Sequence, residues 1–278
     1  MASALFSDLL IVVRGGGDLA TGVVYRLVKA GFPVIVTELA RPVAIRRAVA
    51  FASAIFDGQI TVEGMTARRV ESVAEARHRL ASGEVPVLAD EEGASLAVVR
   101  PAILVDARMA KRNLGTTLGD APLVIALGPG FEAGRDCHAV IETNRGHNLG
   151  RVIWHGAAEP NTGTPGSVQG HMADRVLRAP ADGFVVPYAA IGDSLRAGDM
   201  IASMGDQPVY APFDGALRGL IHPSVQVTRG LKIGDLDPRG ARDHCFTISD
   251  KALAIGGGAL EAILSAPQVR RLLNRAVS

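Results

Sequence analysis

The 278-residue sequence predicts an α/β protein in which a mostly parallel sheet is followed by a small all-β module and a C-terminal helical segment. Three observations support this fold class. Short apolar runs alternate with helical spacing in the first half, an internal repeat occupies the last third, and helical spacing returns after residue 249. The hydrophobic fraction of 48% is ample for a packed core and excludes disorder on a large scale.

The first strand, turn and helix form the best-defined unit of the first half. The apolar run 9–13 is typical of a strand that is covered on both faces, and it ends at three glycines, 15–17. Apolar residues then recur with helical spacing over 19–28, and the run 33–37 supplies a second strand. This pattern predicts a right-handed βαβ unit, so the first half is predicted to be Rossmann-like.

Further strands are predicted by short apolar runs that continue along the first half. These runs lie at 86–88, 103–105, 123–127, 140–141 and 152–154, and a helical stretch lies near 73–80. A doubly wound sheet is the simplest architecture, because strands and helices alternate along the chain.

The turn after the first strand matches a pattern that binds dinucleotides. It reads G-x-G-x-x-A between a strand and a helix, and an acidic residue ends the second strand. Glycines let a ligand approach the backbone, and free N–H groups at a helix N-terminus favour an anion. The predicted cofactor-binding residues here are Gly15, Gly16, Gly17, Asp18, Leu19, Ala20 and Glu38. The alternative is a tight turn that binds nothing.

Two later strands are also followed by polar or Gly-rich loops. Because parallel strands end at the same edge of a sheet, these loops are expected to converge on the same crevice. Asp106, Arg108, Gly128 and Gly130 are therefore predicted to bind the cofactor as well.

The segment 142–148 is dense in groups that bind anions or transfer protons. Arg145 offers a rigid fork for an anion, His147 exchanges a proton near neutral pH, and Glu142 is able to orient either one. These three are the predicted catalytic residues. The alternative is a solvated connection between two strands.

The composition changes after residue 155. Residues 156–172 are rich in Gly, Pro, Asn and Thr and show no periodic pattern. We therefore predict a Rossmann-like ligand-binding domain over 1–155, a linker or functional loop over 156–172, a β-module over 173–240 and a mainly helical segment over 241–278.

The predicted β-module contains an internal repeat with an offset of 32 residues. The residues Ala-Pro-x-Asp-Gly at 179–183 recur as Ala-Pro-x-Asp-Gly at 211–215, and the register persists in glycines at 198 and 230. Two short β-halves related by a pseudo-twofold axis are therefore expected.

The charge balance excludes several classes of partner. With 29 Lys and Arg residues against 28 Asp and Glu residues, the net charge is +1, so nucleic acid is not an expected partner. No apolar stretch approaches the roughly 20 residues of a membrane span, so we expect no membrane contact and a cytoplasmic location. Association into a homo-oligomer is left open.

The Cys and His residues do not suggest a metal site. Cys137 and Cys245 are too few for a disulfide framework and lack zinc-site spacing, so buried and unreactive thiols are expected. The four histidines from His155 onward have no ligand spacing to each other or to the cysteines, and no metal is predicted.

The repeat resembles the biotinyl/lipoyl-type barrel-sandwich module, in which Ala-Pro-x-Asp-Gly opens each half. In the attached versions a lysine stands at the hairpin tip between the halves, whereas the tip at 204–208 has none here. Lys232 lies deep in the second half. The resemblance therefore implies a barrel-sandwich-like module without covalent biotin or lipoate.

Nearly the whole chain resembles the YqeB family. The resemblance rests on 14–22, 105–114, 140–152, 179–183, 218–221, 232–239 and 249–262, and its most specific motifs are IETNRGH at 141–147 and ISDK at 248–251. That family is associated with selenium-dependent molybdenum hydroxylase systems, and its Rossmann half is related to accessory proteins that mature xanthine dehydrogenase.

The resemblance implies maturation or insertion of a molybdenum cofactor, with a molybdenum hydroxylase as the client. A molybdopterin-type dinucleotide carries a pyrophosphate that the turn at 15–20 is able to hold. Two alternatives use the same turn, namely an NAD(P)-dependent oxidoreductase and a nucleotide-sensing adaptor without catalysis. Whether the protein is an enzyme stays open at this point, as does sulfur or selenium transfer.

Overall fold

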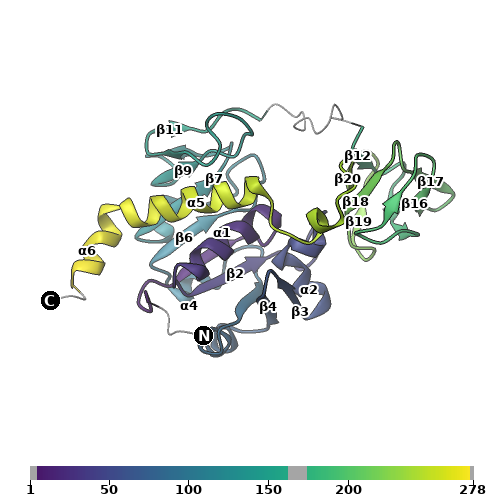
Figure 1. Cartoon of the computed structure of the whole chain (residues 1–278). Helices are drawn as coiled ribbons and strands as arrows, with labels where there is room; N and C mark the ends of the chain where they lie inside the picture. Colours follow the sequence, from purple (N-terminus) through teal and green to yellow (C-terminus); the bar gives the residue numbers. More distant parts are fainter. Residues whose placement is uncertain (1–4, 162–173, 276–278) are drawn as a thin grey trace.

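A computed structural model describes residues 5–161 and 174–275 of the chain (Figure 1). It contains a large, mostly parallel sheet with helices on both faces, together with small antiparallel sheets. The mixed α/β class predicted from the sequence is confirmed. Most of the predicted linker, 162–172, lies outside the described residues.

The large sheet has nine strands within the described residues, in the order β10-β9-β7-β6-β1-β2-β5-β4-β3. The strands from β9 to β4 run parallel, and one antiparallel strand lies at each edge. Their bounds are β1 Ile11–Arg14, β2 Val34–Glu38, β3 Gln59–Val62, β4 Met65–Val70, β5 Val85–Ala89, β6 Ile103–Asp106, β7 Leu123–Leu127, β9 Ala139–Ile141 and β10 Val152–Ile153. The order reverses between β1 and β6, where doubly wound sheets open a ligand crevice.

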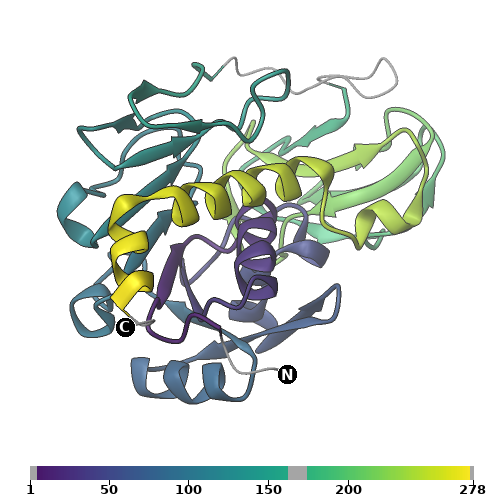
Figure 2. The same ribbon diagram turned by 60° about the vertical axis from the view of Figure 1, so that its left-hand side comes forward.

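Helices cover both faces of the large sheet. On one face α1 (Asp18–Lys29) and α5 (Asp250–Ser265) lie side by side, as two views show (Figures 1 and 2). On the other face α3 (Val73–Ala81) and α4 (Leu96–Val99) cover the alternate side chains of the strands. The other helical elements are α2 Ala54–Asp57, α6 Pro267–Arg275, and the 3-10 turns η1 Arg47–Val49, η2 Phe51–Ser53, η3 Leu118–Asp120 and η4 Arg242–Cys245.

Glycines allow α1 and α5 to approach at backbone distance. A Cβ atom at Gly22 would lie 2.5 Å from the carbonyl oxygen of Ala252, and one at Gly256 would lie 2.5 Å from the carbonyl oxygen of Gly22. Glycine costs a helix interior about 1 kcal/mol relative to alanine. Close packing explains why Gly22 and Gly256 are glycines in spite of this cost. A Cβ atom at Gly257, in contrast, would meet nothing within 4 Å.

Alanine at the adjacent positions 256 and 257 is expected to have opposite effects on stability. Gly256→Ala forces its methyl group against the α1 backbone and should lower the free energy of unfolding by about 1–3 kcal/mol. Gly257→Ala gains helix propensity without a clash and should raise it by about 0.5–1 kcal/mol. Urea denaturation followed by circular dichroism measures both values. Equal effects of the two substitutions would contradict the close approach.

The β-module, defined here as residues 174–240, has a hydrophobic core of its own. Its strands are β12 Val176–Arg178, β13 Gly183–Phe184, β14 Val186–Pro187, β15 Ser194–Leu195, β16 Met200–Met204, β17 Gln207–Tyr210, β18 Gly215–Leu220, β19 Gln226–Val227 and β20 Lys232–Asp237. They form small antiparallel sheets in the orders β12-β20-β18-β15, β13-β19 and β14-β16-β17.

Strand pairing in the β-module follows the sequence repeat. Gly183 of β13 pairs with Val227 of β19, and Gly215 of β18 pairs with Leu195 of β15. Gly183 and Gly215 are 32 residues apart, and so are Leu195 and Val227. The two pairs are therefore equivalent, with the roles of the two halves exchanged. This is the pairing that a pseudo-twofold axis produces.

The aspartates of the repeat make equivalent hydrogen bonds across that axis. Asp182 accepts a hydrogen bond from the N–H of Arg229 at 2.7 Å, and Asp214 accepts one from the N–H of Ala197 at 2.8 Å. The acceptors and the donors are both 32 residues apart. The repeated Asp-Gly pairs therefore join the two halves of the module.

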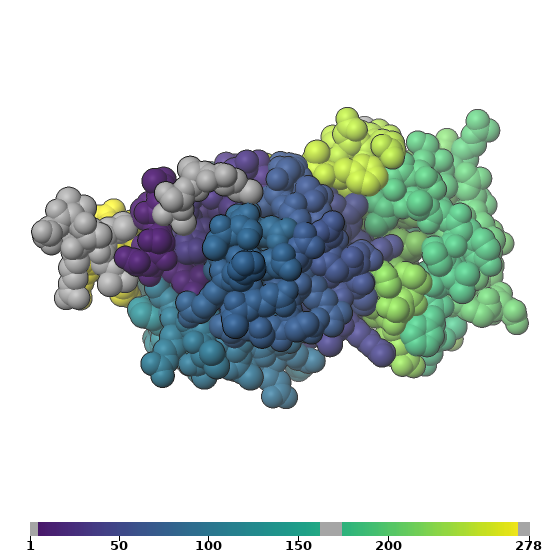
Figure 3. Space-filling view, turned by 90° about the horizontal axis from the view of Figure 1, so that it is seen from below, coloured from purple at the N-terminus to yellow at the C-terminus, as the bar shows by residue number. Residues whose placement is uncertain are grey.

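The β-module contacts the segment that follows β2. The Arg47 guanidinium donates to the carbonyl oxygen of Leu220 at 2.7 Å, and a Cβ atom at Gly219 would lie 2.7 Å from the carbonyl oxygen of Ile45. Ile45 and Phe56 also pack against the core of the module. The space-filling view shows the module, in green, directly against the blue part of the first half (Figure 3).

A hairpin at 59–70 was not predicted from the sequence. Its strands β3 and β4 are joined by Glu63 and Gly64, which have φ angles of 46° and 78°. A two-residue turn with glycine second is a recognisable hairpin signal. Glu63 also accepts the N–H of Ile248 at 2.8 Å, which fixes the chain just before α5. Regular structure also continues past 155, since β11 (Gly156–Ala157) pairs with β8 (Glu132–Ala133).

Candidate functional site

The three glycines of the first turn have different surroundings. Gly15 has a φ of 99°, and a Cβ atom there would lie 2.9 Å from the carbonyl oxygen of Ala107. A Cβ atom at Gly16 would lie 2.8 Å from the backbone nitrogen of Ala52. Gly17 has a φ of −64°, and its Cβ position has no atom within 4 Å. The fold therefore requires glycine at 15 and 16, whereas Gly17 faces open space.

Glu38 is bound to the turn rather than free. Its carboxylate accepts the N–H groups of Gly16 and Leu39, both at 2.7 Å. Burial raises the pKa of Glu38, and these two hydrogen bonds act in the opposite direction. The carboxylate therefore holds the turn in shape while it lines the cavity beside it.

The N-terminus of α1 carries a carboxylate of its own. Asp18 accepts the N–H of Leu19 at 2.9 Å and pairs with Arg46 at 3.3 Å. Within the described residues, the N–H groups of Gly17 and Asp18 donate no hydrogen bond. The turn thus offers backbone donors, but the negative charge of Asp18 opposes a second anion at the same point.

Asp106 and Arg108 form a charged cluster at the end of β6. Asp106 is buried and accepts hydrogen bonds from Arg108 at 2.6 Å and from Thr116 at 2.7 Å. Arg14, at the end of β1, donates to Thr116 at 3.4 Å; its burial, followed by the charge of Arg108, lowers its pKa. This cluster positions Arg108 at the side of the adjoining cavity.

A cavity of about 530 Å³ opens beside the turn, and we call it the turn cavity. Its size is suited to a small-molecule ligand. The predicted residues that line it are Gly15, Gly17, Asp18, Leu19, Ala20, Glu38 and Arg108. Apolar side chains such as Leu39, Val43 and Leu114 form much of its wall. Gly16 and Asp106 do not line this cavity. Gly16 packs against the backbone of Ala52, and Asp106 accepts a hydrogen bond from Arg108.

A second cavity of about 630 Å³ adjoins the first, and we call it the cationic cavity. The two share Asp18, Leu19, Met109 and Lys111. The cationic cavity lies between the carboxyl edge of the large sheet, the start of α5 and the β-module. Its basic residues are Arg46, Lys111, Arg145, Arg175, Arg218, Lys232, Arg239 and Lys251.

The two cavities differ in charge. Eight basic and four acidic residues line the cationic cavity, the acidic ones being Asp18, Glu159, Asp235 and Asp250. The turn cavity has three basic residues, Arg14, Arg108 and Lys111, against the acidic Asp18, Glu38, Asp90 and Glu91. An anionic group is therefore favoured in the cationic cavity, and an apolar ring is suited to the turn cavity.

The predicted catalytic residues do not form one group. Glu142 is buried and accepts the N–H groups of Asn144 at 2.6 Å and Glu159 at 2.7 Å, so it shapes the loop. Arg145 lines the cationic cavity and forms a two-point pair with Asp250, at 2.8 and 3.0 Å. His147 is exposed and is not among the residues that line either cavity.

Gly128 and Gly130 allow the tight backbone path of the loop after β7. Their φ angles are 70° and 103°, and a Cβ atom at Gly130 would lie 2.5 Å from the backbone of Arg112. Neither glycine lines the turn cavity or the cationic cavity, although Pro129 between them lines the cationic cavity. The two glycines therefore set the path of the loop.

The thiols and histidines provide no metal cluster within the described residues, where no group of three or more His, Cys, Asp or Glu side chains could hold an ion. Both cysteines are buried, as predicted. Burial raises the pKa of Cys137 to about 12, so its thiol stays protonated at neutral pH. His171 lies outside the described residues.

Several charged residues of the cationic cavity were not predicted from the sequence. Arg46 comes from the segment after β2, Arg175 and Arg218 from the β-module, and Lys251 from the first turn of α5. The sequence of β20 contained a signal for these basic residues, because Asp235 and Asp237 lie within a short strand. Buried carboxylates need cations nearby.

Comparisons with known proteins give few relatives, and no family model matches the chain. Among solved structures, a succinylglutamatedesuccinylase/aspartoacylase from Rhodobacter sphaeroides is 22% identical with a TM-score of 0.20, covering 23% of this chain and 22% of its own. The ectoine utilization protein EutE (DoeB) from Ruegeria pomeroyi is 13% identical with a TM-score of 0.23, covering 82% and 57%. No helix in the described parts of the chain has the length and apolar character to span a bilayer.

A sequence relative gives the clearer result. The chain is 52% identical over 255 residues to the protein YqeB of Escherichia coli (strain K12). The match covers 92% of this chain and 47% of the E. coli protein, so the chain spans about half the length of the curated relative. The chain is thus similar to YqeB over most of its own length.

Proposed function

We propose that this chain binds a phosphate-bearing pterin or nucleotide at the carboxyl edge of its large sheet. One observation carries the proposal: an apolar cavity beside a Gly-rich turn adjoins a cavity with an excess of basic residues. A ring system with an attached phosphate group requires this combination of surfaces. Gly17 and Leu19 would position the ring side of the ligand, and the adjoining basic residues would attract its charge.

The proposed role is that of an accessory protein for maturation or insertion of a molybdenum cofactor. The likeness to the YqeB family supplies this context, since the family is associated with selenium-dependent molybdenum hydroxylases. The cavities fit such a cofactor chemically, because a molybdopterin dinucleotide combines flat rings with a pyrophosphate. When bound, that group would supply the metal chemistry, and this chain would bind it, orient it and shield its rings from water.

An exposed apolar surface on the β-module supports docking of a hydroxylase client. Tyr188 is 62% exposed, Tyr210 is 53% exposed and Phe184 is 50% exposed. Tyr210 belongs to β17 and Tyr188 directly follows β14 of the same sheet, whereas Phe184 belongs to β13. Exposed aromatic side chains are enriched where proteins bind each other, so a client would bury them on docking.

Mass spectrometry of the native protein tests the proposal directly. The protein should be purified at low salt from cells that make a molybdenum cofactor and analysed intact, and its bound small molecules should be released and identified. We expect a pterin dinucleotide or a related phosphate ester at a stoichiometry near one. The same chain with Gly17→Leu serves as the matched control and should be empty. A native protein that carries no such molecule and is not stabilised by one would contradict the proposal.

A nicotinamide-dependent oxidoreductase is the second candidate, because Glu38 ends β2 and lines the turn cavity where such enzymes bind a ribose. Both Glu38 oxygens already accept backbone N–H groups, however. An oxidoreductase would show an absorbance change at the nicotinamide band with a suitable substrate. A cofactor carrier would instead show stabilisation by a pterin dinucleotide without that change.

A further inference from the structure

We propose that the cationic cavity is a binding site for a phosphate or diphosphate group, built jointly by the first half and the β-module around Arg218 and Arg46. The inference depends on the proposed function only for the identity of the molecule that carries the group. The site adjoins the Gly-rich turn at Asp18 and Leu19, and Arg218 comes from the β-module. The module is therefore part of the binding site as well as a surface for partners.

The acidic residues of β20 are too few for the basic residues around them. Asp235 pairs with Arg175 at 3.1 Å, with Lys232 at 3.8 Å and with Arg218 at 3.8 Å. Asp237 is fully buried and is already held by Arg239 at 2.6 Å. Four basic groups thus share two carboxylates, which leaves positive charge unbalanced on this side of the cavity.

Of these basic groups, Arg218 has the weakest contacts with hydrogen-bond acceptors. Its side chain is only 13% exposed, yet its Nε atom has no hydrogen-bond partner among the described residues. Its contacts with Asp235 and Asp237 are long, at 3.8 and 3.7 Å. A buried guanidinium without close acceptors is costly, and an anion with several oxygens would supply them.

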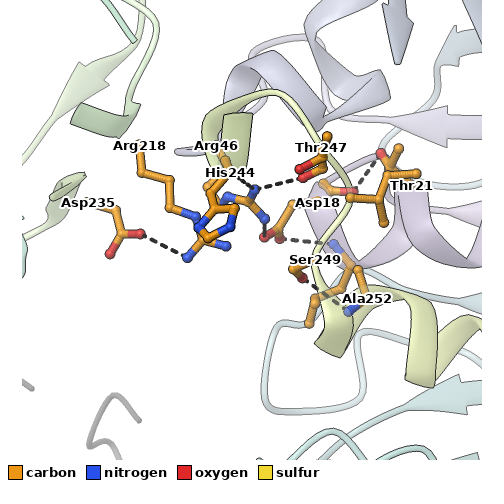
Figure 4. Close-up of polar contacts among 12 residues, drawn as sticks. Asp18, Thr21, Arg46, Arg218, Asp235, His244, Thr247, Ser249 and Ala252 are labelled. Carbon is orange, nitrogen blue, oxygen red and sulfur yellow. Dashed lines mark hydrogen bonds and ion pairs between the residues drawn. The ribbon is translucent and has the colours of Figure 1, made fainter. Parts of the chain in front are cut away.

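The first half contributes Arg46 from the opposite side. Arg46 is 8% exposed, donates to the carbonyl oxygens of His244 and Thr247 at 3.0 and 3.1 Å, and has an Nε atom without a partner among the described residues. Figure 4 shows its guanidinium next to that of Arg218, between Asp18 and Asp235. Burial lowers the pKa of Arg218, and the charge of Arg46 is the next cause. Neighbouring guanidinium groups repel each other, and an anion bound between them would offset this repulsion.

Lys251 adds a basic group from the start of α5. Its side chain is partly buried, and within the described residues it forms no ion pair shorter than 4 Å. Burial lowers its pKa, and the charge of Arg145 lowers it further. At the start of α5 the Ser249 side chain already accepts the N–H of Ala252 at 3.2 Å, so Lys251 contributes to this site through its charge.

The chemistry of the lining favours phosphate over a carboxylate. Guanidinium forks match phosphate oxygens in pairs, and a phosphate or diphosphate carries enough negative charge to offset several cations at once. A single carboxylate would leave most of the excess positive charge in place. The cavity volume of about 630 Å³ accommodates a diphosphate with its hydration water.

Titration calorimetry with inorganic pyrophosphate at low ionic strength tests this inference on the full chain. We expect binding by the wild type that weakens as salt is added, because the site is electrostatic. Arg218→Ala should lower the affinity about tenfold or more, the effect of losing hydrogen bonds to a charged group. Arg229→Ala removes the same charge from an exposed residue of the module outside both cavities and should change the affinity by less than about twofold. Circular dichroism verifies that each variant is folded.

The outcomes also separate this inference from the proposed function. Gly17→Leu should block a pterin or nucleotide but keep pyrophosphate binding, since Gly17 lines only the turn cavity. If Arg218→Ala and Arg229→Ala bind pyrophosphate equally, or if the wild type does not bind it, the inference is overturned even where the ring ligand binds. If pyrophosphate binds through Arg218 while no pterin or nucleotide binds, the inference stands and the proposed function fails.

Discussion

Leucine at position 17 is expected to block binding of the pterin or nucleotide while the chain keeps its fold. Gly17 has an ordinary φ of −64°, and its Cβ position is open toward the turn cavity, so a side chain there costs no backbone strain. A leucine would fill the space that the ligand needs. We expect an affinity at least about 100-fold lower, or ~2.7 kcal/mol, measured by calorimetry with the ligand released from the native protein.

The neighbouring glycine provides the matched control. Gly15→Leu places a side chain at a φ of 99° and within 2.9 Å of the Ala107 backbone, so it should lower the melting temperature strongly. Gly17→Leu should leave the melting temperature close to that of the wild type. Unchanged ligand affinity in a folded Gly17→Leu protein would show that the ligand does not use the turn cavity.

The large sheet was well predicted because its local pattern and its packing agree. Strands such as β7 and β9 are buried along their whole length, so their sequences are continuous apolar runs. The repeat at 179–183 and 211–215 likewise encodes strand pairing that the structure contains. The β3–β4 hairpin lies at the edge of the sheet and mixes polar with apolar residues, which hides it from a search for apolar runs.

The candidate site was predicted only in part because it is assembled from distant segments. The Gly-rich turn is local in sequence, so its motif was visible, and most of its residues line the turn cavity. The cationic cavity combines Arg46, Arg218 and Lys251, which come from three separate segments of the chain. No local pattern links such residues. Their convergence follows from contacts such as that between Arg47 and Leu220.

The loop at 142–147 shows why residue type alone does not assign a role. Glu142 has a side chain suited to proton transfer, but both of its oxygens accept backbone N–H groups in the interior. Arg145 and His147 are both exposed, but Arg145 lines the cationic cavity and His147 lines neither cavity. The conformation of the loop therefore separates groups that the sequence places together.

Replacing Asp237 with asparagine should clearly lower the stability of the β-module. Asp237 is fully buried and accepts hydrogen bonds from the Arg239 guanidinium at 2.6 and 2.9 Å and from its N–H at 3.1 Å. Loss of this charge leaves Arg239 and Arg218 without a shared carboxylate. Removing one partner of a fully buried pair costs about 3–5 kcal/mol, but the Arg239 side chain is 36% exposed, so urea denaturation at pH 7 should show a smaller decrease of about 1–3 kcal/mol for Asp237→Asn.

The pH dependence of this effect identifies its cause. Burial alone would raise the pKa of Asp237, but the hydrogen bonds from Arg239 outweigh burial and lower the pKa to about 2. The charged form therefore contributes its full stabilisation above the unfolded pKa of about 4, and the contribution is lost as the pH falls toward 2. The difference between wild type and Asp237→Asn should be constant from pH 7 to pH 5 and should shrink below pH 4. Asp206→Asn, at an exposed turn of the same module, should leave the urea midpoint unchanged throughout. A difference that persists undiminished at pH 2 would mean that the cost comes from packing rather than from the charge.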